Sequence, residues 1–205
     1  AVPSGNYTLE ASTTLPWGGV NSTDALTIQN HVIGSTILSG LYATAIDVNL
    51  SGSNTSADAL LVRQRFVSLI NDFAAGDWAF NPDPVSVLSV STEDFQGICM
   101  GDVNGSYVPS VIRNSSIELQ QEGSLVCNSK EITIPITIKE DVMMGALSMV
   151  IEFSNPVTIS DVFMKSENLN QDLIYNVVND QLRISWMNTN GVKLQAEESL
   201  LEITL

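Results

Sequence analysis

One stretch of this chain occurs twice, with an offset of 34 residues. Residues 24–28 (Asp-Ala-Leu-Thr-Ile) align with residues 58–62 (Asp-Ala-Leu-Leu-Val), and a glycine and a serine precede each copy at matching positions. After each aspartate, apolar residues recur at the spacing of a helix face. The repeat therefore predicts two loop-and-helix units within residues 16–70, whose helices can cover each other's apolar faces.

The loop before the second helix, residues 47–58, reads Asp-Val-Asn-Leu-Ser-Gly-Ser-Asn-Thr-Ser-Ala-Asp. Numbered from 1 to 12, it has oxygen-bearing side chains at positions 1, 3, 5, 9 and 12 and glycine at position 6. The calcium loop of an EF-hand takes its ligands from these positions and from the carbonyl at position 7, and its glycine makes a sharp turn. The alternative is a metal-free turn in which Asp58 only caps a helix. The predicted calcium ligands are Asp47, Asn49, Ser51, Ser53, Thr55 and Asp58.

The loop before the first helix lacks the first half of such a site. Its positions 3 and 5 are Leu15 and Trp17, whose side chains cannot ligate calcium. Its second half is intact, with Gly19, Asn21 and Asp24 at positions 7, 9 and 12. This loop alone therefore cannot form a complete site.

A third fragment has the opposite defect. Asp102, Asn104 and Ser106 reproduce positions 1, 3 and 5, but position 12 would be Arg113. We therefore predict that this fragment folds back to complete the site begun by residues 19–24, which would make a second calcium site split between distant segments. A bound ion would then stabilise the fold by joining them. The alternative is that residues 102–106 form a simple turn and the first site is empty.

The C-terminal part of the chain, residues 112–205, carries short strand patterns separated by turn signals. Several such strands favour a β-sandwich. Further strand patterns precede this part. The fold class predicted for the whole chain is α+β with more than one domain. The predicted strands are residues 5–13, 78–80, 85–90, 131–138, 146–153, 173–178, 182–186 and 200–205.

Charge and composition exclude several functions. The formal net charge is −15, which argues against binding a nucleic-acid backbone or an anionic membrane surface. A single histidine, His31, leaves no means of building a catalytic triad, so we expect no enzyme activity. The two cysteines, Cys99 and Cys127, have no zinc-site spacing, and they either form one disulfide or both stay free.

The duplicated loops resemble the type I dockerin family. The resemblance covers about residues 13–70 and rests on the Asp-x-Asn-x-Ser-Gly loop with its final Asp58, and on the phrase at residues 20–26. The phrase at residues 101–106 has the same wording, whereas the first loop departs from the family pattern by lacking its early ligands. The resemblance implies calcium as the cofactor, at two sites.

The strand-rich part resembles a cohesin domain, less specifically, through residues 132–136, 145–153 and 182–186. Cohesins are jelly-roll β-sandwiches longer than this segment, so we expect it to be incomplete and the chain to be part of a longer protein. The expected organisation is the last strand of a preceding β domain at residues 1–12, a dockerin-like domain at residues 13–110 and a cohesin-like domain at residues 111–205.

Dockerins bind cohesins by presenting helix faces to a sheet. The resemblance therefore implies a cohesin-like partner, in cis or in trans, and a secreted or cell-surface bacterial protein. The alternative role is a carbohydrate-binding accessory module of a polysaccharide-degrading enzyme, although aromatic residues are only 6% of the chain. The contact residues that the resemblance implies, which are otherwise helix caps and solvated charges, are Ser22, Thr23, Ser56, Ala57, Arg63 and Arg65.

Overall fold

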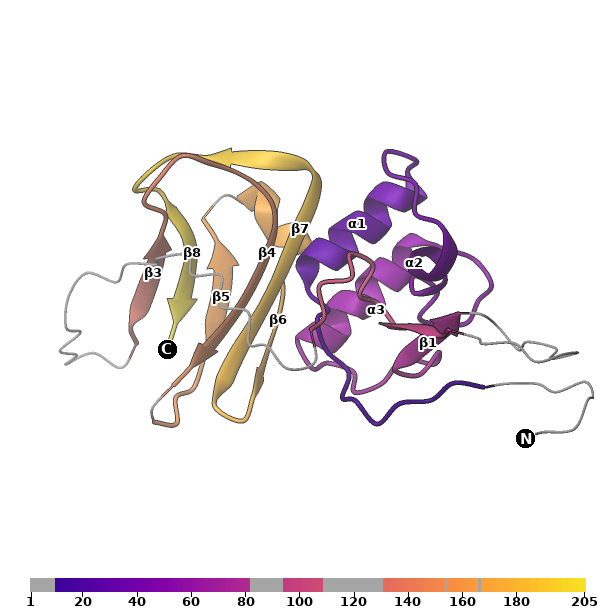
Figure 1. The fold of residues 1–205 in the computed structure, drawn as a ribbon. Coiled ribbons are helices and arrows are strands. Elements are labelled where there is room, and N and C mark those ends of the chain that lie inside the picture. The colour runs from indigo at the N-terminus through magenta and orange to yellow at the C-terminus, as the bar shows by residue number, and fades with distance from the viewer. Residues whose placement is uncertain (1–9, 82–93, 109–130, 154, 166) are drawn as a thin grey trace, which may run out of the picture.

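The computed structural model describes residues 10–81, 94–108, 131–153, 155–165 and 167–205 (Figure 1). They form two parts, which we call the helical unit (residues 10–81 and 94–108) and the sheet unit (the described residues from 131 to 205). The predicted strand at residues 1–12 falls mostly outside the described residues, and residues 10–12 are not in a strand. The predicted strand at residues 85–90 also lies outside them.

The two copies of the repeat form two helices of 11 residues each, α1 (Ser22–Val32) and α3 (Ser56–Phe66). Asn21 caps α1 and Thr55 caps α3, and each cap side chain accepts a hydrogen bond from the first turn of its helix. In return, the aspartate at the third helical position accepts a hydrogen bond from the backbone of the cap residue, which makes a capping box. The sequence repeat is therefore also a repeat of local structure.

A short helix, α2 (Gly40–Thr44), and a hairpin of β1 (Trp78–Asn81) and β2 (Gln96–Cys99) complete the helical unit. Residues from across this unit share one core. Because Ile98, Met100 and Val103 belong to that core, residues 96–103 pack with the helices as part of the same unit. This explains how distant parts of the chain come to lie side by side. The core is formed by Val20, Ala25, Ile28, Ala45, Ile46, Val48, Ala59, Val62, Phe73, Ile98, Met100 and Val103.

The sheet unit consists of two antiparallel sheets that share a second core. One has the strand order β3 (Thr133–Thr137), β8 (Ser199–Thr204) and β5 (Asp161–Met164). The other has the order β4 (Val142–Glu152), β7 (Gln181–Leu194) and β6 (Ile174–Val178). A 3-10 helix, η1 (Glu167–Asp172), precedes β6, and its Leu169 carbonyl accepts a hydrogen bond from the buried Trp186 indole.

The predicted α+β class is confirmed, because a helical N-terminal part is followed by antiparallel sheets. The jelly-roll connection stays a prediction. Strands β2 and β5 and helix α2, of four or five residues each, were not predicted. Elements this short have too few positions for a reliable periodicity, although β1 and β6, of similar length, were predicted. In Figure 1 the helical unit lies against the β4–β7–β6 sheet, with α1 near β7.

Candidate calcium loops and the helix–sheet contact

The contiguous loop, residues 47–58, is wound around the carboxylate of its first residue. The backbone N–H of Ser51 donates to one Asp47 carboxylate oxygen at 2.9 Å, and that of Gly52 donates to the other at 2.8 Å. The Ser51 hydroxyl donates to the carbonyl of Ser53 at 3.0 Å. Positions 1, 5, 6 and 7 are thus joined to one another by hydrogen bonds.

The last carboxylate of this loop, Asp58, is fully buried. Its Oδ2 accepts hydrogen bonds from the N–H of Thr55 at 2.9 Å and from the Thr55 hydroxyl at 3.0 Å. Its Oδ1 is also buried and has no hydrogen-bond partner among the residues that the structure describes. A buried carboxylate oxygen without a partner is costly, and a cation bound in the loop would remove that cost.

The structure also brings together the two half-sites that the sequence separates, residues 19–24 and 102–107, which we call the split loop. The N–H of Ser106 donates to one Asp102 carboxylate oxygen and that of Tyr107 to the other, both at 2.9 Å. The Ser106 hydroxyl donates to the carbonyl of Gly19 at 3.1 Å. The N–H of Asn21 donates to Asp24 at 3.0 Å.

These contacts repeat those of the contiguous loop position by position. Asp102 corresponds to Asp47 at position 1, and its carboxylate accepts from the amides of positions 5 and 6 in the same way. The hydroxyl at position 5 reaches the carbonyl at position 7 in both loops, and the amide at position 9 reaches the carboxylate at position 12. Two separate segments therefore adopt the conformation of one loop of 12 residues.

The split loop places two buried carboxylates close enough to affect each other. Asp24 is fully buried and Asp102 is 1% exposed. Burial, followed by the charge of Asp102, raises the pKa of Asp24 to about 7, despite hydrogen bonds from the amides of Asn21, Asn104 and Val103. A divalent cation between the two groups would favour their charged forms.

Both loops fit calcium by the chemistry of their donors. Among the described residues, no three His, Cys, Asp or Glu side chains gather into a metal site. Each loop instead offers two carboxylates, with amide, hydroxyl and carbonyl oxygens for the remaining positions, and calcium takes such all-oxygen ligand sets. The ligands would be Asp47, Asn49, Ser51, Ser53, Thr55 and Asp58 in one loop, and Asp102, Asn104, Ser106, Gly19, Asn21 and Asp24 in the other.

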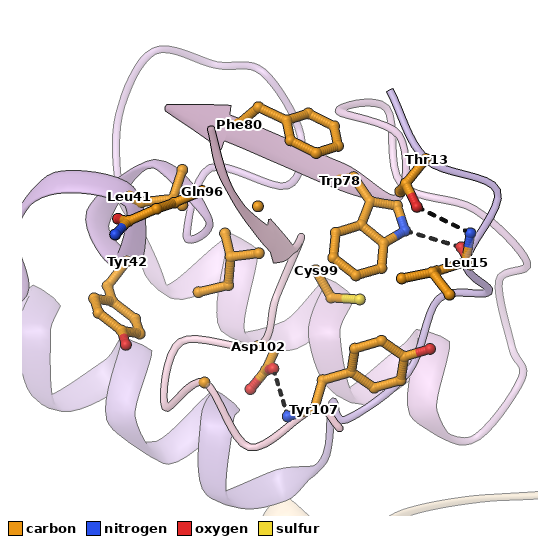
Figure 2. A pocket seen from close by; sticks show the side chains of 13 residues that line it. Thr13, Leu15, Leu41, Tyr42, Trp78, Phe80, Gln96, Cys99, Asp102 and Tyr107 are labelled. Atoms are coloured by element: carbon orange, nitrogen blue, oxygen red, sulfur yellow. Dashed lines mark hydrogen bonds between the residues drawn. The ribbon is translucent and has the colours of Figure 1, made fainter. Parts of the chain in front are cut away.

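Tyr107 takes position 6 of the split loop, as its place after Asp102, Asn104 and Ser106 in the sequence predicts, where the contiguous loop has Gly52. Figure 2 shows its backbone nitrogen hydrogen-bonded to Asp102 and its ring near Trp78. Gly19, at φ +81°, packs directly under this residue: a Cβ built on Gly19 would lie 2.6 Å from the Tyr107 Cβ and 3.0 Å from its backbone nitrogen. The junction of the two half-sites therefore has no room for a side chain on Gly19.

We expect Gly19→Ala to weaken calcium binding by the split loop and to lower the melting temperature of the helical unit. Gly52→Ala is the matched control, because Gly52 also has a positive φ, +76°, but a Cβ there meets nothing within 4 Å. The control should lose only the backbone cost, about 1–2 kcal/mol. Gly19→Ala should lose more, since the backbone of Tyr107 must also move. Equal losses in thermal unfolding would contradict the tight junction.

The contact between the two units centres on Ser22, the first residue of α1, which is fully buried. Its hydroxyl donates to the Leu147 carbonyl at 2.7 Å and lies 2.7 Å from the Ser148 hydroxyl and 2.8 Å from the Ser185 hydroxyl. Its backbone N–H donates to the Ser148 hydroxyl at 2.8 Å. Ser148 and Ser185 are paired across β4 and β7, so both hydroxyls lie next to each other where Ser22 contacts the sheet.

Arg63 contacts the same place from α3. Its Nε donates to the Ser185 hydroxyl at 3.1 Å and its Nη2 to the Ser185 carbonyl at 3.0 Å, and Nη2 also contacts the Asp172 carbonyl. Arg65 was expected beside Arg63 in a contact surface, but it points into the helical unit instead. It contacts Asp77 at 2.6 Å and lies over the Trp17 ring at 3.9 Å. Thr23, Ser56 and Ala57 are exposed.

An open pocket of about 610 Å³ lies between the β1–β2 hairpin and the split loop (Figure 2). Its aromatic side chains pack on one another. The Trp78 ring stacks on that of Phe80, with 6.3 Å between the ring centroids, and meets the Tyr107 ring edge-on, with 5.6 Å between the centroids. Cys99 lines it as a free thiol, and burial raises the thiol pKa to about 11. Cys127 lies outside the described residues.

The comparisons with known proteins bear on the helical unit. No curated protein and no solved structure matches the chain. A scan against family models matches residues 18–67 to the dockerin type I domain. This range holds α1, α2, α3, the contiguous loop and one half of the split loop. Residues 18–67 are therefore similar to a dockerin type I domain, a non-catalytic module that binds protein partners.

Proposed function

We propose that this chain is a calcium-dependent protein-interaction module of the dockerin type, belonging to a secreted or cell-surface protein. The unpartnered Oδ1 of the buried Asp58 carries the calcium part of the proposal, because it closes a loop whose other oxygens occupy calcium-ligand positions. The family match of residues 18–67 supports the interaction part. No helix among the described residues has the length and apolar character to span a membrane.

The second calcium ion of the proposal belongs to the split loop. Its support is the set of hydrogen bonds that Asp102, Ser106 and Asn21 share with their counterparts in the contiguous loop. Calcium there would join the start of the helical unit to its end. The partner of the proposal is a β-sheet domain of the cohesin kind, which meets the edge of the helical unit that bears Ser22 and Arg63.

Isothermal titration with calcium tests the number of sites. We expect about two ions per wild-type chain, about one after Asp102→Ala or Asp47→Ala, and none with high affinity after both substitutions together, since each removes the position 1 carboxylate of one loop. Asp94→Ala is the control, because Asp94 is exposed and belongs to neither loop. One ion in the wild type, unchanged by Asp102→Ala, would refute the split site.

A further inference from the structure

The N-terminal ends of the two repeated helices, α1 and α3, have different surroundings, although their sequences and caps are equivalent. Ser22 and Ser56 are equivalent first residues of 11-residue helices, each preceded by a cap residue within a capping box. Ser22 is fully buried and bound to the β4–β7–β6 sheet, whereas Ser56 is exposed. Only one of two locally equivalent helix ends therefore meets the sheet.

The contact between the Ser22 end of α1 and the β4–β7–β6 sheet is a specific, polar interface. At its centre three hydroxyls meet one guanidinium: Ser22 lies between Ser148 and Ser185, and Arg63 donates to Ser185. Arg63 is 4% exposed, and burial lowers its pKa from the usual value of an arginine. Ser22, Ser185 and Arg63 are buried, whereas Ser148 lies at the exposed edge of the cluster. Buried polar groups are costly unless they are paired, so the buried part of the cluster is stable only when the two surfaces match each other.

The surrounding surface fits as well. A Cβ built on Gly145 would lie 3.0 Å from the Leu26 side chain, so the glycine allows α1 to approach a bulge of β4 closely. Met187 of β7 packs against the core of the helical unit. At the far end of α3, the side chain of Arg183 donates to the Phe66 carbonyl at 3.3 Å. The contact therefore extends along both helices.

The centre of this contact also lies within the split loop. Ser22 directly follows Asn21 and is followed two residues later by Asp24, and both are proposed calcium ligands at positions 9 and 12. Calcium bound there would fix the backbone that presents the Ser22 hydroxyl and amide. Loss of the ion would release the same backbone, because no covalent link joins residues 19–24 directly to residues 102–107.

We propose that the partner of the helical unit is the β4–β7–β6 sheet of its own chain, and that calcium in the split loop stabilises this intramolecular docking. The inference rests on the proposed function, since it uses the same interaction edge and the same ion. Tethering within one chain gives an effective concentration on the order of millimolar, so the docked sheet outcompetes a dilute external domain for the Ser22 edge. The equivalent edge at Ser56 stays open.

Ser22→Arg tests the docking, with Ser56→Arg as the matched control, because both substitutions change the first residue of a capped helix. Small-angle scattering is measured for the full chain in calcium. We expect the radius of gyration of Ser22→Arg to rise by roughly a fifth or more as the units separate, and that of Ser56→Arg to equal the wild type. A compact Ser22→Arg chain, or equal expansion of both variants, would overturn the docking.

Two further measurements keep the test independent of folding and of calcium binding. If Ser22→Arg loses helical circular dichroism, Ser185→Arg decides, since Ser185 is fully buried and contributes to the same cluster from the sheet side. Expansion of this variant supports the docking and compactness refutes it. Adding chelator to the wild type should cause the same expansion. Calcium binding without any effect on compactness would refute the link between ion and docking, while the absence of calcium binding would refute the proposed function itself.

Discussion

Removing calcium should lower the melting temperature of the helical unit by roughly 15–30 °C. Two sites, each with free calcium at about 30 times its Kd, together contribute about 4 kcal/mol to folding, and 1 kcal/mol corresponds to about 4–8 °C in a domain of this size. The reason is specific to this chain. Without the ion, the helical unit keeps the unpartnered oxygen of Asp58 and two facing buried carboxylates, Asp24 and Asp102.

Circular dichroism of the helices and tryptophan fluorescence measure this loss. Trp17 and Trp78 belong to the helical unit, whereas Trp186 is buried in the core of the sheet unit. Calcium should therefore shift the transition seen by the first two tryptophans more than the transition seen by Trp186, which the ion reaches only through the docking of the two units. Magnesium is the matched control ion, because it demands a smaller octahedral site. Identical melting curves in calcium and in chelator would rule out calcium as a folding ligand.

The alternation of oxygen side chains was enough to predict where the loops lie. In residues 47–58 the spacing of the ligands, the glycine at position 6 and the helix that follows all indicate one local conformation, so little tertiary information is needed. The split loop could also be anticipated, because each half lacks what the other supplies. The fold class follows from helical periodicity in one part and strand patterns in the other.

The role of Tyr107 could not be predicted by the same reasoning. In a contiguous loop position 6 is glycine because the chain must turn sharply there into position 7. In the split loop, positions 6 and 7 are Tyr107 and Gly19, which are not joined, so no turn is needed and a bulky residue is allowed. In the split loop the residue that must be small is instead Gly19, which packs under Tyr107.

The cluster of Ser22, Arg63, Ser148 and Ser185 at the contact between the two units could not be predicted from the sequence either. Its serines on the sheet are 37 positions apart in sequence and meet only because Ser148 is the register partner of Ser185. Strand register depends on the packing of the whole sheet, and a shift of one residue between β4 and β7 would leave the two serines on opposite faces. The inward position of Arg65 has a similar cause, since it depends on where Trp17 and Asp77 pack.

Without calcium, the chain should become less stable as the pH rises from about 4 to about 7. Burial and the charge of Asp102 raise the pKa of Asp24 from 3.8 to about 7 in the folded chain. Between these values the folded chain holds a proton that the unfolded chain has released, so raising the pH favours unfolding. The difference corresponds to an upper limit of about 4 kcal/mol, at 1.36 kcal/mol for each pH unit.

Urea denaturation in chelator at a series of pH values measures this trend, and the difference between the wild type and Asp24→Asn isolates it from other titrating groups. The variant removes the charge at nearly constant shape, so its stability should change less over the same pH range. Calcium should abolish the fall for the wild type, because the bound ion favours two ionised carboxylates in the split loop. If the metal-free wild type gained stability relative to Asp24→Asn between pH 5 and pH 7, the two carboxylates would not face each other as the split loop requires.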